Sequence, residues 1–138
     1  MKGKTINELK VGDSASFTKT VSEHDVYSFA GITGDFNPAH INEEYAKKTF
    51  FKKRIAHGML SAGFISTVLG TKLPGPGTIY IEQDLEFTKP VYFEDTVTMT
   101  VTVLQIIKEK NRVMLKTTGK NQNGDIVIDG VAVVSPPK

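Results

Sequence analysis

The stretch Gly58-Met-Leu-Ser-Ala-Gly-Phe-Ile-Ser-Thr-Val-Leu-Gly70 is the segment of the sequence that decides the fold. It is apolar nearly all round and rich in small residues, whereas a helix on a protein surface shows a single apolar stripe. A segment of about 13 residues is too short to span a bilayer but long enough for a helix inside a domain. The sequence therefore predicts a helix over residues 58–70 that other elements enclose.

The second half of the chain shows the two-residue period of β-strands. Apolar residues alternate with polar ones over Ile79–Phe87, which predicts a half-buried strand, and again over Val97–Val103. A shorter β-rich run covers Val113–Thr118, and Ile126–Val134 is β-branched on both faces, which predicts a more buried strand. Asn123-Gly124 predicts a hairpin turn before the last strand, because this pair accepts positive φ angles. Together these segments predict an antiparallel meander of about four strands.

The first half of the chain is mixed. Ser14–Val21 is a predicted strand, and Ser22 is a candidate cap for a helix that follows it. A second short helix is predicted after Asn42, because two glutamates follow this cap residue and two lysines come later. One enclosed helix and several antiparallel strands indicate an α+β fold with a sheet wrapped around the helix. Because such a sheet has open edges, we expect it to pair with a second copy of the chain.

Composition limits the class of protein. The chain has 138 residues, which predicts a single domain over 1–138, and it has no cysteine, which excludes disulfides, thiolate metal sites and Cys nucleophiles. A net charge of +2 argues against nucleic-acid binding. No apolar run is long enough for a membrane span, and no signal peptide is recognisable at the N-terminus. We therefore expect a cytoplasmic protein without a membrane or nucleic-acid partner.

The stretch Thr33-Gly-Asp-Phe-Asn-Pro-Ala-His40 contains the candidate chemistry. Asp35 and His40 are separated by Asn37-Pro38, and proline disfavours a helical conformation at the residue before it. We predict that both side chains lie on a rigid turn between two short helices, where they could act as a general acid/base pair on a water molecule. The residues alone also allow a structural interpretation, with Asp35 and Asn37 as turn residues and His40 at a helix edge.

Gly58 directly follows His57 at the start of the predicted enclosed helix. The first N–H groups of a helix lack backbone partners and could stabilise a developing enolate as an oxyanion hole does. Alternatively, Gly58 and Gly63 are small because the helix is tightly wrapped. His24 is predicted to lie at the surface and His57 to have a structural or pocket-wall role. The histidines lack the short paired spacing of zinc sites, so we expect no metal.

The motifs quoted so far resemble those of the MaoC-like dehydratase family, and within it the (R)-specific enoyl-CoA hydratases. The resemblance extends from about Leu9 to Val134 and includes five segments: Phe29-Ala30, Gly34–His40, Ile55–Leu60, Leu73–Tyr80 and Phe87–Val91. It implies a hot-dog fold, in which a central helix is wrapped by a five-stranded antiparallel sheet. It also implies a homodimer formed through the sheet, or a higher oligomer.

The resemblance further implies a reaction, the reversible syn addition of water to a short-chain trans-2-enoyl-CoA to give an (R)-3-hydroxyacyl-CoA. Asp35 and His40 match the catalytic pair of the family, which holds one water, and the Gly58 N–H would bind the thioester oxygen. Ser66 and Asn37 match family positions near the substrate, with Ser66 in an orienting role. The acyl-CoA is the substrate, and neither a metal nor a redox cofactor is implied.

Three other functions remain as alternatives. A hot-dog acyl-CoA thioesterase shares the fold but places its acidic residue elsewhere, and a 3-hydroxyacyl-carrier-protein dehydratase performs the same chemistry on another thioester. A non-catalytic acyl-CoA sensor of this fold is expected to have an appended DNA-binding domain. Contacts to CoA phosphates could come from Arg54, Lys52, Lys53 or Lys89, although surface charge also explains these residues.

Overall fold

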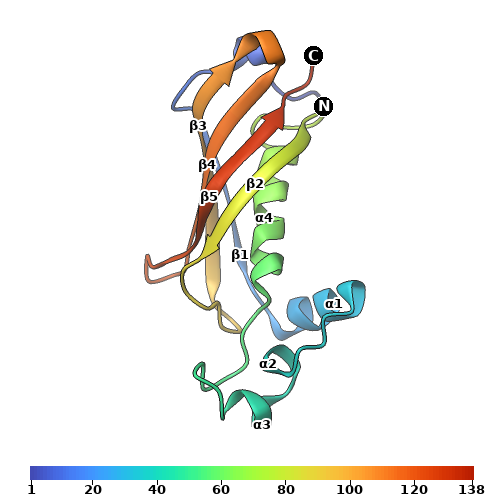
Figure 1. Ribbon diagram of the computed structural model, residues 1–138, viewed down its shortest axis with the longest axis vertical. Coiled ribbons are helices and arrows are strands. Elements are labelled where there is room, and N and C mark those ends of the chain that lie inside the picture. The colour runs from blue at the N-terminus through green and yellow to red at the C-terminus, as the bar shows by residue number, and fades with distance from the viewer.

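Five antiparallel strands form one curved sheet along a long helix in the computed structural model, which describes residues 1–138 (Figure 1). The order across the sheet is β1 (Ser14–Thr20), β3 (Thr96–Ile107), β4 (Arg112–Lys120), β5 (Ile126–Ser135) and β2 (Ile79–Phe87). The helix α4 spans Gly58–Thr71 and lies along the sheet. The α+β hot-dog fold expected from the sequence is confirmed.

The core lies between α4 and the inner face of the sheet. One side of α4 is buried there through Phe64, Ile65, Val68 and Leu69. Alternate residues of β3 face it, namely Val97, Met99, Val101 and Val103, each at most 1% exposed. The opposite side of α4 stays open to solvent at Gly63 and Ser66. Within a single chain α4 is therefore enclosed on one side only, whereas the sequence predicted that other elements enclose it.

The strand β2 differs from its prediction. It is mostly exposed and not half-buried, with Ile79 and Ile81 exposed by 62% and 42%. β2 is the edge of the sheet and pairs with β5 alone, and a register shift between Tyr80 and Glu82 interrupts its alternation. β5 lies between two strands and is largely buried, as its β-branched residues predicted.

Three helices before α4 gather at one end of the sheet (Figure 1): α1 (Glu23–Thr33), α2 (Pro38–Ile41) and α3 (Glu43–Ala46). The predicted caps of α1 and α3 are confirmed. The hydroxyl of Ser22 accepts from the Asp25 backbone N–H at 3.0 Å, and the Asp25 carboxylate accepts from the Ser22 N–H at 3.0 Å. The Oδ1 of Asn42 accepts from the Tyr45 N–H at 3.0 Å. These bonds fix the starts of both helices.

The remaining elements are short. Two 3-10 helices, η1 (Ile6–Glu8) and η2 (Lys108–Lys110), precede β1 and β4. The predicted hairpin turn before β5 is present, and Gly124 adopts a φ of +81°. α4 is the longest helix at 14 residues, and no helix has the length and hydropathy needed to cross a membrane.

Candidate active site

The segment between α1 and α2 places Asp35 at the mouth of a hollow. α1 ends at Gly34, whose φ of +81° turns the chain away from the helix axis. The Asp35 Oδ1 then accepts from the Asn37 backbone N–H at 3.2 Å, and the side chain remains half exposed. The predicted turn is therefore present at Asp35, and its carboxylate is available to a bound molecule.

His40 lies on a helix and not on the turn where the sequence predicted it. Pro38 is the first residue of α2, because its fixed φ suits the first turn of a helix and its missing N–H costs nothing there. The Oδ1 of Asn37 accepts from the Ala39 N–H at 3.1 Å and caps this helix. Asn37 therefore has a structural role as the cap of α2, and its side chain is exposed.

The protonation of His40 follows from its contacts. Its Nδ1 lies 2.7 Å from the carbonyl oxygen of Ile55, and a carbonyl oxygen can only accept, so Nδ1 bears the proton. The neutral ring then has its lone pair on Nε2. Burial lowers the pKa of His40 and outweighs the hydrogen bond to Ile55, which raises it. His40 is therefore set up as a neutral general base near pH 7.

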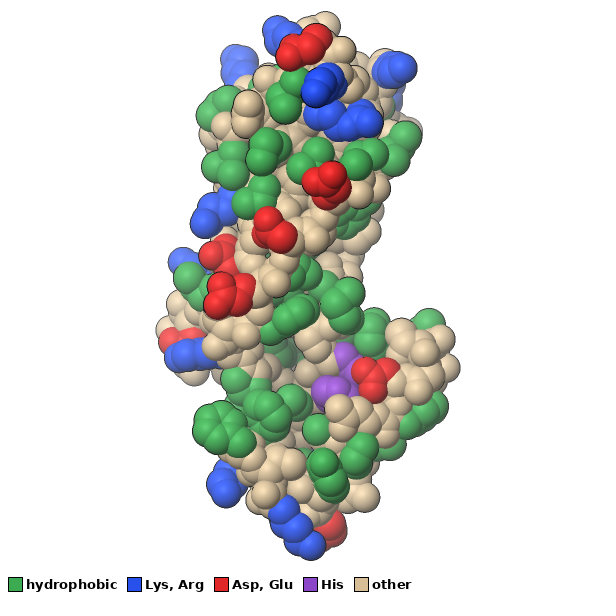
Figure 2. Space-filling model, viewed as in Figure 1, with side chains coloured by type: hydrophobic (Ala, Val, Ile, Leu, Met, Phe, Trp, Pro, Cys, Tyr) green, Lys and Arg blue, Asp and Glu red, His purple; other side chains and the backbone are tan.

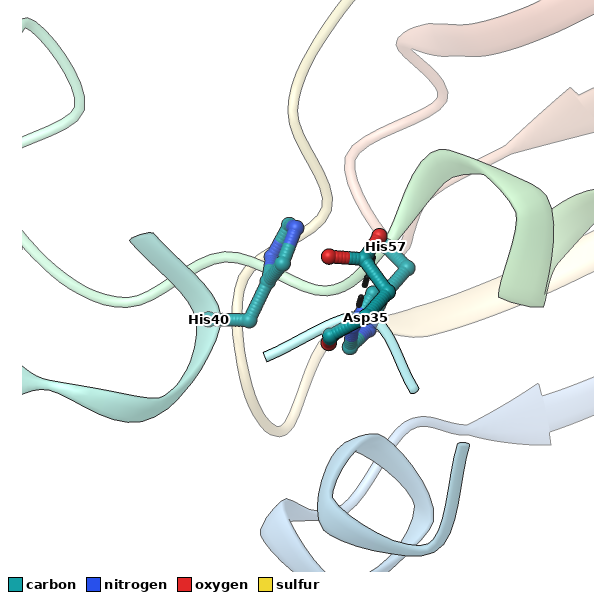
Figure 3. Close-up of side chains that lie close together, drawn as sticks. All are labelled: Asp35, His40 and His57. Atoms are coloured by element: carbon teal, nitrogen blue, oxygen red, sulfur yellow. Dashed lines mark hydrogen bonds and ion pairs between the residues drawn. The ribbon is translucent and has the colours of Figure 1, made fainter. Parts of the chain in front are cut away.

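His57 joins the two candidate catalytic residues (Figure 3). Its ring stacks on the ring of His40 with centroids 3.8 Å apart, and it is 2% exposed. Its Nε2 lies 2.9 Å from the backbone oxygen of Asp35 and 4.0 Å from the carboxylate. One side-chain nitrogen or oxygen from each of the three residues lies within 4.8 Å of the others. The structural role predicted for His57 is thus a contact with both Asp35 and His40.

The same three residues are a poor set of metal ligands. A histidine binds a metal through a nitrogen without a proton. The Nε2 of His57 and the Nδ1 of His40 each donate to a backbone carbonyl, and the Nδ1 of His57 is sealed from solvent. The Asp35 carboxylate and the His40 Nε2 are the two groups that remain as possible metal ligands. This arrangement suits proton transfer better than metal binding. His24, by contrast, is exposed on α1, as predicted.

Gly58 begins α4 beside a cavity of about 570 Å³. A Cβ at this position would lie 2.7 Å from the Phe87 ring, so any larger residue requires the ring or the start of the helix to shift. A Cβ at Gly63 would meet nothing within 4 Å, so tight wrapping explains Gly58 but not Gly63. Figure 2 shows histidine side chains beside an acidic one in a hollow edged by hydrophobic groups. Asp35, His40 and His57 do not line this cavity themselves, but Ile55, whose carbonyl oxygen accepts from His40, does.

Sequence analysis singled out Ser66 on α4, but the structure places the other serine of this helix, Ser61, at the cavity. Ser66 is exposed and lies eight residues from Gly58, about 12 Å along the helix, so this chain does not bring it to Asp35 and His40. Ser61 is 2% exposed, lines the cavity, and its Oγ has no hydrogen-bond partner. Sequence analysis missed Ser61. No local signal marks this residue, because its importance depends on which segments pack around it.

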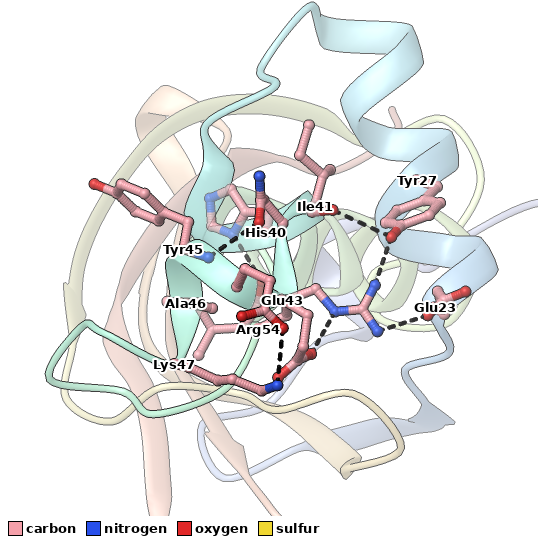
Figure 4. A network of polar contacts seen from close by, with 12 residues as sticks. Glu23, Tyr27, His40, Ile41, Glu43, Tyr45, Ala46, Lys47 and Arg54 are labelled. Carbon is pink, nitrogen blue, oxygen red and sulfur yellow. Dashed lines mark hydrogen bonds and ion pairs between the residues drawn. The ribbon is translucent and has the colours of Figure 1, made fainter.

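Arg54 lies four residues before α4 and binds side chains of α1 and α3 (Figure 4). Its Nη2 and Nε lie 2.9 Å from Glu23 on α1 and Glu43 on α3, and its Nη1 donates to the Tyr27 hydroxyl. A guanidinium held by two carboxylates is not free to bind a CoA phosphate. The Lys89 ammonium, at the cavity, lies 3.4 Å from the Asp125 carboxylate, where both side chains are solvated.

Comparisons with known proteins identify the family of the chain. The family model of the MaoC-like domain matches residues 7–124. An (R)-specific enoyl-CoA hydratase of Rhodospirillum rubrum is 58% identical over 94% of this chain and 90% of its own. A 3-hydroxybutyryl-CoA dehydratase of Methylorubrum extorquens is 47% identical over 95% and 83%. The unliganded R-hydratase PhaJ1 of Pseudomonas aeruginosa superimposes with a TM-score of 0.93 at 45% identity, covering 99% of this chain and 87% of that one. The chain belongs to the MaoC-like domain family.

Proposed function

We propose that the protein is an (R)-specific enoyl-CoA hydratase that adds water reversibly to short-chain trans-2-enoyl-CoA thioesters. The observation that carries this proposal is the pairing of an ionisable carboxylate, Asp35, with a buried histidine whose Nε2 bears the lone pair. The names of the relatives, an (R)-specific enoyl-CoA hydratase and a 3-hydroxybutyryl-CoA dehydratase, support the same reaction and a four-carbon acyl group.

In the proposed mechanism one water molecule lies between the Asp35 carboxylate and the His40 Nε2. One of the two groups removes a proton as the hydroxyl oxygen bonds to C3, and the electron pair of the C2–C3 double bond moves toward the thioester. A proton is then delivered to C2, so one O–H bond breaks while C3–O and C2–H bonds form. Because both groups lie on one side of the substrate, the addition is syn.

The thioester oxygen is proposed to accept from the Gly58 N–H at the start of α4. This N–H lies at the positive end of the dipole of α4, which stabilises the negative charge of the enolate.

We further propose that the protein works as a homodimer, or as an oligomer built from that dimer. The free edge of β2 and the small residues on the open side of α4 support this arrangement, because a second copy would cover both. Met59, Ile81 and Phe87 lie on this surface and are exposed by 60%, 42% and 49%. Ser66 and Gly63 would then lie at the contact between copies, where Ser66 could reach the partner's substrate.

The first experiment follows the loss of enoyl-thioester absorbance with crotonyl-CoA, together with chiral analysis of the product and a parallel assay for free CoA thiol. We expect rapid loss of absorbance, an (R)-3-hydroxy product and no thiol. Release of thiol would identify a thioesterase instead. Activity restricted to carrier-protein thioesters would contradict the proposed CoA substrate.

Two substitutions test the assignment of the catalytic pair. We expect Asp35→Asn and His40→Gln each to lose at least about 10³-fold in kcat, because each removes a proton carrier while leaving the size of the side chain nearly unchanged. Circular dichroism and gel filtration would check that both variants remain folded and keep the wild-type oligomeric state. Full activity in either variant would disprove the role of that residue.

A further inference from the structure

Two buried polar atoms near the active site have no hydrogen-bond partner, the Nδ1 of His57 and the Oγ of Ser61. Leaving a buried polar atom unpaired costs about 1–3 kcal/mol, so two such atoms in one place need an explanation. His57 is the cap residue of α4, with an extended backbone, and Ser61 follows four residues later in the first turn of the helix. Both atoms therefore belong to the start of α4.

The contacts of His57 define what its Nδ1 needs. Its Nε2 donates to the backbone carbonyl of Asp35, so in the neutral ring the proton is on Nε2 and the lone pair is on Nδ1. Nδ1 is therefore an acceptor that lacks a donor. Ser61 has a hydroxyl, whose hydrogen rotates freely, and its side chain has three staggered rotamers. A hydroxyl that reaches this acceptor would satisfy both atoms.

We infer that Ser61 is a positioning residue, whose hydroxyl donates to the Nδ1 of His57 after rotation of its side chain or through one enclosed water. The bond acts together with the Asp35 carbonyl in holding the His57 tautomer that has its proton on Nε2. The kinetic consequence rests on the proposed hydratase function, but the tautomer itself does not.

This tautomer supports both catalytic residues at once. With its proton on Nε2, His57 holds the backbone of Asp35, and its ring is the surface against which His40 stacks. The other tautomer would turn a lone pair toward the Asp35 carbonyl oxygen and replace attraction with repulsion. The segment around Asp35 would then shift, and a displacement of about 1 Å of a reacting group can cost on the order of 10² in rate.

The test reads the tautomer directly. The chain has three histidines, so long-range ¹H–¹⁵N spectra of the rings can be assigned with the His24→Gln and His40→Gln variants. We expect the wild-type His57 ring to have its proton on Nε2 and a hydrogen-bonded Nδ1. In Ser61→Ala the Nδ1 should lose the signature of a hydrogen bond, and the preference for the tautomer with its proton on Nε2 should weaken. A wild-type ring with its proton on Nδ1 would overturn the inference, whether or not the protein hydrates crotonyl-CoA.

Kinetics separate positioning from packing and from substrate contact. We expect Ser61→Ala to lower kcat about tenfold with KM changed by less than about twofold, since the substrate is not touched. Ser61→Cys restores the volume but donates poorly, so it should resemble Ser61→Ala, whereas a packing role predicts recovery. Thr71→Ala, which removes another hydroxyl of α4 far from the site, is the matched control and should keep wild-type kcat. A rise in KM alone would mean that Ser61 contacts substrate, which contradicts the inference.

Discussion

The environment of His40 determines how activity depends on pH. Burial lowers its pKa below the value of about 6.5 for an exposed histidine, and the ring must be neutral to accept a proton. We therefore expect the acidic limb of the kcat/KM profile to have a midpoint below pH 6.5. His24 is exposed on α1 and offers a control, because His24→Gln should leave the profile unchanged. A midpoint above pH 6.5 would contradict the assignment of His40 as the base.

The same shift couples His40 to stability. An unfolded chain binds the proton at a higher pH than the folded chain does, so the free energy of unfolding falls as pH drops below about 6.5. This loss continues until the pH passes the lowered pKa of the folded state. Urea unfolding at several pH values would detect the decrease, and His40→Gln should reduce it.

Gly58 tests the close approach between α4 and β2. In Gly58→Ala the added Cβ would lie 2.7 Å from the Phe87 ring, so the ring or the start of the helix must move. We expect a loss of about 1–3 kcal/mol in stability and at least about tenfold in kcat, because the N–H proposed to bind the thioester oxygen moves too. Gly31→Ala, with open space on α1, should keep full activity. Equal activity and melting temperature in Gly58→Ala would contradict this prediction.

At the residue scale the sequence predicted Asp35 and His40 as a pair but did not predict how His57 joins them. The paired motif is local, because both residues lie in one short stretch. The stacking of His57 on His40 depends on how α2 packs against the start of α4, and no local pattern encodes a contact between segments 17 residues apart. The buried Ser61 was missed for the same reason, since its importance depends on what surrounds it.

Among the elements, the single-turn helix α2 has the largest effect on the site, because it presents His40. Its cap is the Asn37 side chain, and losing such a cap costs about 1 kcal/mol. We expect Asn37→Ala to lower kcat several-fold, whereas Asn37→Ser, which also caps helices, should retain most of the activity. A cap role is wrong if Asn37→Ser is as impaired as Asn37→Ala, as contact between the amide and substrate would produce. Steady-state kinetics with crotonyl-CoA measures the difference.

Elements with strong periodicity were predicted well, and short or irregular ones were not. The alternation over Val97–Val103 located β3, but the strand continues to Ile107 because a register shift between Val103 and Gln105 lets it resume after the alternation breaks. α2 was predicted as a turn because four residues are too few to show a helical period. The exposure of β2 was missed because alternation marks a strand but not its place at the edge of a sheet.

The whole molecule presents an apolar surface around β2 that supports the proposed homodimer. We expect Ile81→Lys to convert the protein to a monomer, because it places a charge on the free edge strand where copies would meet. Analytical ultracentrifugation measures the mass in solution. Leu104→Lys on β3 has a similar initial exposure, 46% against 42%, and should remain a dimer. A wild-type monomer, or a dimeric Ile81→Lys, would contradict the proposed interface.

The proposed proton carriers come from one part of the chain, whereas the cavity beside them draws on several. Asp35, His40 and His57 all lie within residues 35–57. Arg54 belongs to the same stretch and binds Glu23 and Glu43. The cavity is built from four separate segments, including the end of β2 and the start of β5. Residues 88–91 and 127–128 of its lining lie far along the chain from the proton carriers and from the start of α4. Random variation confined to these residues could diversify the accepted thioesters while the reaction itself stays intact, which makes this scaffold a favourable starting point for directed evolution.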